Sequence, residues 1–289
     1  MGFPHWILLL QLVLFRGTCS PCADNSSWEI VFVEDFDGDV LNTSRWSVRH
    51  NMTHGPAERQ LYVSAAVTVS GGALRLKTRH EEHGVMSANG TMYNFSSGWV
   101  DSRGKLFHSF GRVEVRAQLP SPAAGAEGKW SEAWPAHWLM PEPSTSHPPD
   151  VCWPVGGEID IMEGFHPRGE SNSHEYSIYN TYHWAVDCNQ DLWNSTNGKF
   201  PPLNDTSTKL DFTGWHTYAV EWSAAALHWF VDDRLVYSRF AGDPPSLFIP
   251  SDPFYVILNT ALTPWTSSLD PGFPVEHVVD SVVWCKPVN

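Results

Sequence analysis

Three carboxylic acids lie within a stretch of six residues in an otherwise apolar part of the sequence, at Glu158, Asp160 and Glu163. The surrounding residues favour a β-strand, and on a regular strand Glu158 and Asp160 point to one face while Glu163 points to the other. One extra residue around Ile161 and Met162, a β-bulge, would turn all three carboxylates to the same face. The segment therefore predicts a bulged strand that carries an acidic cluster.

Such a cluster has a chemical use. Three carboxylates on one face cannot all ionise freely, so at least one pKa should rise. One glutamic acid can then remain protonated as a general acid while the other, ionised, acts as a nucleophile, and the aspartate between them tunes both. A separation of about 5–5.5 Å between the two glutamate carboxyls fits retaining glycoside hydrolysis, and a wider one fits inversion. An edge strand protected by charge and a calcium site remain open alternatives.

The elements that must position these acids are predicted to be strands. The segments 67–69 and 74–76 flank a Ser-Gly-Gly turn and predict a hairpin. Residues 112–119 alternate strictly, with apolar side chains expected on the buried face and polar ones, including Arg112 and Glu114, on the outer face. Further strands are expected over 215–222, over 227–237 as two strands around Asp232-Asp233, and over 254–262.

Composition limits the class of protein. The 289 residues are 42% hydrophobic, which suffices for a sizeable core, and 15 Trp, 15 Phe and 8 Tyr exclude a disordered chain. The formal net charge of -14 and the lack of any basic tract exclude a nucleic-acid partner. No linker, repeat or capped amphipathic helix follows Asp24, and 22 Pro and 21 Gly punctuate the chain. We therefore expect one all-β sandwich domain over 24–289.

Two loop-like inserts, 121–129 and 140–154, bracket a tryptophan-rich segment at 130–140. Ordered loops of this length are more often functional than idle. We expect both loops beside the acidic cluster. The many aromatic residues suit a neutral ligand with flat apolar faces, such as a sugar.

The N-terminus has the pattern of a signal peptide. Residues 6–15 form an apolar run too short to span a bilayer, and the small residues after it allow cleavage anywhere from Cys19 to Ala23. We expect a signal peptide over 1–23 and a secreted chain with no membrane association after cleavage. Seven Asn-x-Ser/Thr sequons, an excess for 13 asparagines, agree with export and glycosylation. The acceptors are Asn25, Asn42, Asn51, Asn89, Asn94, Asn194 and Asn204.

The five cysteines fit no zinc pattern once the signal peptide is removed. An oxidising compartment favours a disulfide between Cys152 and Cys188. Cys285 is then free, or paired with Cys22 if that residue survives cleavage. Three buried thiols are the alternative.

The sequence resembles glycoside hydrolase family 16, especially its laminarinase-like branch of endo-β-1,3-glucanases. GGEIDIMEG at 156–164 matches the E-x-D-x-x-E signature of that branch, whose extra residue is the bulge inferred above. Other similar segments are SSGWVDSRGKLFHSFGRVEVRAQLP at 96–120, AWPAHWLMP at 133–141, TYHW at 181–184, WHTYAVEW at 215–222, FVDDRLVY at 230–237 and FYVILNTAL at 254–262. The resemblance covers residues 28–284, nearly the whole mature chain.

The resemblance implies a concanavalin-like β-jelly roll, in which two curved antiparallel sheets form a sandwich with a concave substrate cleft. By position in the signature, Glu158 resembles the nucleophile, Glu163 the acid/base and Asp160 the assisting carboxylate. No organic cofactor is implied, although the family often binds one structural calcium, for which Asp280 is a possible ligand.

The resemblance also implies substrate-binding residues. Trp134 and Trp138, four apart on one strand and therefore on one face, resemble sugar-stacking tryptophans. His183 resembles a cleft histidine near the reacting sugar, and core packing is the open alternative for all three. The chain departs from the family by Trp99 in place of an arginine and by residues 57–62, which lack the asparagine of N-E-x-Q-Y. These departures leave substrate preference less certain than reaction type.

We therefore expect a secreted, retaining endo-β-glucanase that hydrolyses laminarin-like β-1,3-glucan through a glycosyl-enzyme intermediate, as a monomer. The alternatives on the same scaffold are a β-1,3-1,4-glucanase, an algal galactan hydrolase, a transglycosylase and a non-catalytic glucan-recognition protein. The shorter E-x-D-x-E spacing of plant xyloglucan transferases is absent, which disfavours that branch.

Overall fold

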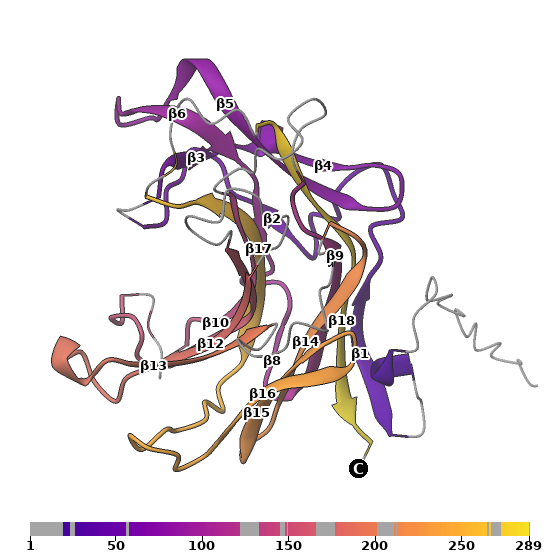
Figure 1. The fold of residues 1–289 in the computed structure, drawn as a ribbon, viewed down its shortest axis with the longest axis vertical. Helices are drawn as coiled ribbons and strands as arrows, with labels where there is room; N and C mark the ends of the chain where they lie inside the picture. Colours follow the sequence, from indigo (N-terminus) through magenta and orange to yellow (C-terminus); the bar gives the residue numbers. More distant parts are fainter. Residues whose placement is uncertain are drawn as a thin grey trace, which may run out of the picture.

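The computed structural model describes residues 20–23, 27–55, 58–121, 133–144, 148, 150–165, 177–200, 211, 213–264, 266 and 273–288. These residues form two β-sheets, which Figure 1 shows as neighbouring curved layers. The helical elements of this part of the chain are three 3-10 turns, η1 (Pro21–Ala23), η2 (Ser64–Ala66) and η3 (Gln190–Leu192). No helix within the described ranges is long and apolar enough to cross a membrane.

Sheet A contains ten strands. Its order is β16 (Arg234–Phe240), β15 (Ala226–Val231), β14 (His216–Trp222), β9 (Gly111–Gln118), β18 (Val275–Pro287), β5 (Leu74–Met86), β6 (Met92–Ser97) and β3 (Gln60–Tyr62). In addition, β1 (Trp28–Glu34) pairs with β18, and β4 (Val67–Val69) pairs with β5. Every pair in this sheet is antiparallel except β3 with β6.

Sheet B contains eight strands, and all its pairs are antiparallel. Its order is β13 (Asn194–Phe200), β12 (Ser177–Trp184), β11 (Glu158–Phe165), β10 (Ala133–Pro141), β17 (Phe254–Leu262), β7 (Trp99–Asp101) and β2 (Ser47–Val48), with β8 (Phe107–His108) paired to β17. The all-β sandwich and the strands predicted from the sequence are thereby confirmed.

The core lies between the two sheets. Strand β9 buries Val113, Val115 and Ala117 completely, as its two-residue alternation predicts. His137 of β10 and His277 of β18 also meet there, with their Nε2 atoms 2.8 Å apart and both side chains fully buried. This contact joins the two sheets by a hydrogen bond between neutral rings, because two charged imidazoles would have no acceptor between them.

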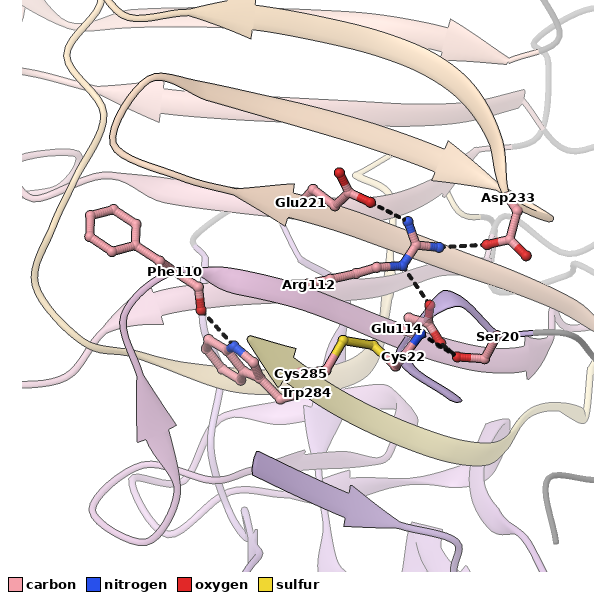
Figure 2. Close-up of a disulfide and its surroundings, with 9 residues drawn as sticks. All are labelled: Ser20, Cys22, Phe110, Arg112, Glu114, Glu221, Asp233, Trp284 and Cys285. Carbon is pink, nitrogen blue, oxygen red and sulfur yellow. Dashed lines mark hydrogen bonds and ion pairs between the residues drawn. A yellow bond between two sulfur atoms is a disulfide. The ribbon is translucent and has the colours of Figure 1, made fainter. Parts of the chain in front are cut away.

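The outer face of β9 is covered, contrary to expectation. Arg112 and Glu114 point away from the core, yet their exposed fractions are 1% and 3%. Figure 2 shows the Arg112 guanidinium among three carboxylates, those of Glu114, Glu221 (3.0 Å) and Asp233 (2.6 Å). The hydroxyl of Ser20 donates to Glu114. A polar side chain on an outer face is therefore buried here by an N-terminal segment that strand periodicity does not anticipate.

That segment, residues 20–23, is tied to sheet A by a disulfide between Cys22 and Cys285 of β18. Both cysteines are fully buried in a cluster with Val283. The second disulfide joins Cys152 to Cys188, which confirms the pairing expected from the sequence. The signal peptide predicted over 1–23 includes this packed segment. Residues 1–19 lie outside the described residues, so the signal peptide stays a prediction.

Other expectations are only partly covered by the described residues. Most of the insert at 121–129 and two sequons, Asn25 and Asn204, lie outside them. Glycosylation of the chain stays a prediction. Asp280, proposed as a calcium ligand, forms an ion pair with Arg116 at 3.0 Å.

Candidate active site

Strand β11 carries all three acids on one face because it contains a bulge. Asp160 pairs with Thr181 of β12 and Glu163 with Tyr179, so three steps along β11 match two steps along β12. On its other side β11 has the same irregularity, with Trp138 opposite Asp160 and His137 opposite Met162. The extra residue returns Glu163 to the face of Glu158 and Asp160, while Ile161 and Met162 are fully buried. The predicted bulge is confirmed.

Two hydrogen bonds satisfy the carbonyl groups around the bulge. The Asn180 side-chain amide on β12 donates to the Ile161 carbonyl at 2.7 Å. The Trp229 indole N–H, from sheet A, donates to the Asp160 carbonyl at 2.9 Å. Buried carbonyl groups need such partners, so these contacts stabilise the irregular strand in one conformation.

A glycine makes the turn into β11 possible. Gly157 has φ +95°, and a Cβ atom there would lie 3.1 Å from the ring of Tyr182. Tyr182 is itself held by a hydrogen bond from its hydroxyl to the Phe248 carbonyl, 2.8 Å long. The chain can therefore enter the acidic segment at this angle only without a side chain at position 157.

Each glutamate accepts hydrogen bonds from specific donors. Glu163 accepts from the Trp134 indole N–H at 3.2 Å and from the Thr181 hydroxyl at 3.0 Å. Glu158 accepts from the Trp153 indole N–H at 2.8 Å. These donors orient the two carboxyl groups and favour their ionised forms.

His183 lies beside the acids, as its position in TYHW predicts. Its Nε2 is 3.4 Å from Oδ2 of Asp160 and 3.9 Å from Oε1 of Glu158. Its ring also contacts Trp153, with centroids 5.1 Å apart. The histidine thus lies within reach of both carboxyl groups, on the strand that neighbours them.

The pKa values of all three acids are raised. Burial raises the pKa of Glu158 to about 8, and the charge of Asp160 adds to the rise. Burial and the charge of Glu163 raise the pKa of Asp160 well above its usual range. Burial raises the pKa of Glu163, against the opposing effects of His183, Thr181 and Trp134. At neutral pH the cluster therefore retains protons, as an acid catalyst requires.

The two predicted stacking tryptophans occupy different environments. Trp134 is half-buried beside Glu163. Trp138 also faces the side of the acids, but only 6% of it is exposed, and its indole N–H donates to the side-chain oxygen of Asn259 at 2.7 Å. Its other neighbours are the rings of Trp99 and His54. Packing by residues distant in sequence therefore covers Trp138.

Sequence reasoning missed Trp153 and Trp193. Trp153 follows Cys152, whose disulfide to Cys188 anchors the loop, and 42% of Trp153 is exposed. Its ring meets that of Trp193 edge to face at 5.4 Å. The only sequence signal was the length of the insert at 140–154, expected beside the acids.

One group of side chains among the described residues has spacing that suits a metal ion. It comprises Glu158, Asp160 and His183, whose ligand atoms lie within 4.8 Å of one another. Two of these residues, Glu158 and Asp160, belong to the acidic cluster, and the third is the neighbouring His183 of β12. The calcium predicted near Asp280 stays a prediction, with Arg116 the observed partner of that carboxylate.

Comparison with known proteins gives a consistent family assignment. The family profile described as Glycosyl hydrolases family 16 matches residues 64–268. A β-glucanase from Rhodothermus marinus is 33% identical over 275 residues, covering 88% of this chain and 84% of the relative. Glucan endo-1,3-beta-glucosidase A1 from Niallia circulans is 28% identical over 281 residues, covering 86% of this chain but 37% of that longer protein.

A solved structure has the same fold. The laminarinase catalytic domain from Thermotoga maritima superposes with a TM-score of 0.72 at 25% identity, covering 91% of this chain and 99% of that domain. The jelly-roll architecture expected from the sequence is therefore confirmed.

Proposed function

The chain belongs to glycosyl hydrolase family 16, and from this premise we propose that it is a secreted endo-β-glucanase that cleaves β-1,3-linked glucan with retention of configuration. The observation that carries the proposal is the bulge in β11, which gathers Glu158, Asp160 and Glu163 on one face. The laminarinase and β-glucanase similarities support the substrate class. The two disulfides are consistent with secretion.

In the first step, an ionised Glu158 oxygen attacks the anomeric carbon of the bound sugar. The carboxyl group of Glu163 gives its proton to the glycosidic oxygen as the bond between that oxygen and the anomeric carbon breaks. An ester joins Glu158 to the sugar, and the shortened glucan departs with a new hydroxyl.

In the second step, the carboxylate of Glu163 takes a proton from water. The water oxygen attacks the anomeric carbon and breaks the ester, which returns Glu158 as a carboxylate and Glu163 as an acid. Two inversions at one carbon give net retention.

Neighbouring side chains assist these steps. Asp160, whose pKa is raised, can hold a proton next to Glu158, and His183 lies against both groups. Trp153 holds the attacking glutamate through its indole N–H and presents an exposed ring to the same face. An exposed aromatic ring beside the acids supports a sugar substrate.

The test is hydrolysis of laminarin by the wild type and by Glu158→Gln, measured as released reducing ends. We expect the substitution to lower kcat by about 10³ or more with the melting temperature unchanged, because glutamine is isosteric but cannot form the ester. Glu276→Gln, which changes a half-buried acid on sheet A, is the matched control and should retain full activity. Full activity in Glu158→Gln would refute the assignment.

Two further measurements separate the alternatives. Proton NMR of the first products should show the β-anomer, whereas the α-anomer would indicate inversion. A panel of laminarin, lichenan, agar and carrageenan, with product sizes and transfer products recorded, distinguishes the β-1,3-glucanase from the other enzymes proposed on this scaffold. Binding of laminarin without any release of sugar would indicate a glucan-recognition protein.

A further inference from the structure

The face of sheet B that carries the acids continues across neighbouring strands. Next to β11 lies β10 with Trp138, then β17 with Asn259, then β7 with Trp99. Adjacent strands are about 4.8 Å apart, so a glucan that extends from the acids toward β7 crosses Trp138 first and Trp99 next. Both indoles are where a sugar ring would need a stacking surface.

Another ring already covers both indoles. The imidazole centroid of His54 lies 5.3 Å from that of Trp99 and 5.4 Å from that of Trp138. The exposed fractions of the two tryptophans are 4% and 6%, whereas His54 is itself exposed. His54 is thus the solvent-facing member of this aromatic group.

The segment that carries His54 is attached on both sides. Met52 and Tyr62 exchange backbone hydrogen bonds, the shorter of which is 2.8 Å. The side-chain oxygen of Asn51 accepts a hydrogen bond of 2.7 Å from the Ala88 backbone N–H. The Glu58 carboxylate accepts hydrogen bonds from backbone N–H groups of this loop. These attachments hold the backbone on either side of His54.

The indole N–H of Trp138 is also occupied. It donates to Asn259, whose own amide nitrogen donates to the Tyr62 hydroxyl at 3.0 Å. The opposite side of the acids differs, because 42% of Trp153 is exposed there and its ring packs against Trp193. An exposed aromatic ring, Trp153, therefore lies on the β12 side of the acids, whereas on the β7 side Trp134 is half-buried and Trp138 and Trp99 are covered.

We propose that His54 is a specificity-determining residue, which caps Trp138 and Trp99 and thereby ends the sugar-binding positions on the β7 side of the acids. The inference rests on the proposed β-1,3-glucanase function. A gluco-oligosaccharide gains affinity from each sugar ring that stacks on an aromatic side chain. The cap therefore reduces the preference of the enzyme for long oligosaccharides over short ones.

The test compares kcat/KM for laminari-oligosaccharides of increasing length in the wild type and in His54→Ala. Removal of the ring uncovers the Trp138 face, and one added stacking contact should raise kcat/KM for the octasaccharide about five-fold relative to that for the trisaccharide. His54→Phe keeps a ring over the indoles and should preserve the wild-type ratio. His50→Ala removes another exposed histidine from the same segment, one that contacts Ser64, and should also leave the ratio unchanged.

Acrylamide quenching of tryptophan fluorescence gives a readout without catalysis and should increase in His54→Ala only. The proposed role of His54 would be refuted if its replacement by alanine left the ratio of kcat/KM for the octasaccharide to that for the trisaccharide unchanged or lowered it. Hydrolysis by the wild type would in that case still support the proposed function. A wild type that hydrolyses none of the oligosaccharides would overturn the proposed function, and the role of His54 with it.

Discussion

The hydrogen bond from Trp153 to Glu158 offers a direct test of how the site controls the ionisation of its proposed nucleophile. Trp153→Phe removes the indole N–H that lies 2.8 Å from Oε2 of Glu158 and retains an aromatic ring against His183. The ionised form of Glu158 thereby loses its indole donor. The pKa of Glu158, about 8 in the wild type, must therefore rise.

The magnitude follows from the environment of the bond. A hydrogen bond to a charged group contributes about 1.5–3 kcal/mol, and the 42% exposure of Trp153 favours the lower end. A loss of about 1.5 kcal/mol corresponds to about one pKa unit. Because the proposed nucleophile Glu158 must be ionised to attack, the acidic limb of the pH profile should move upward by about one pH unit. At pH values below that limb, kcat/KM of the variant should be about ten-fold lower than that of the wild type.

The assay is kcat/KM on laminarin as a function of pH, which reports the titration of the free enzyme. Trp215→Phe is the matched control, because Trp215 is similarly exposed at 38% but lies just before β14, with the Arg116 guanidinium over its ring. An acidic limb that stays in place in Trp153→Phe, or moves to lower pH, would refute the reasoning.

Three further outcomes are expected. Cys285→Ser opens a disulfide with a sequence separation of 263 and should lower the free energy of unfolding by about 5 kcal/mol in denaturant titrations. N-terminal sequencing of the secreted protein should find Ser20 and Cys22 retained, because both are packed on sheet A; a mature chain that begins at Asp24 would contradict this. Burial lowers the pKa of His277 to about 4. Above about pH 6.5 this histidine is neutral in both the folded and the unfolded chain, and between about pH 6.5 and pH 4 only the unfolded chain takes up the proton. The free energy of unfolding should therefore fall by about 3 kcal/mol over this range. Replacing His137 and His277 together by leucine should remove this part of the pH dependence in melts at pH 7 and 4.

Strand positions and the acidic cluster could be predicted because their signals are local. The alternation in residues 112–119 and the spacing of Glu158, Asp160 and Glu163 depend only on the two-residue repeat of a strand. The bulge followed from the same parity argument. The sequence therefore located the candidate catalytic strand and its irregularity.

The surroundings of that strand depend on distant contacts, which periodicity does not encode. Trp138 is covered by His54, and Arg112 is buried partly by a segment that includes Ser20. Trp153 reaches Glu158 from a loop that a disulfide anchors. In each case neither the residue type nor its position in the strand pattern indicates the contact. The contact depends on which distant segment packs there in the folded chain.

The bulge also makes two properties of β11 independent of each other, namely the spacing of its acids and its pairing with β12. Three steps of this strand span two steps of β12, so one residue between Asp160 and Glu163 has no pairing partner. Deleting that residue would give the regular E-x-D-x-E spacing and leave every later pair with β12 unchanged, with all three acids still on one face. The surplus residue therefore adjusts the distance and tilt between the two glutamates without altering the register of the sheet. Catalytic geometry and strand pairing can vary independently at this one position.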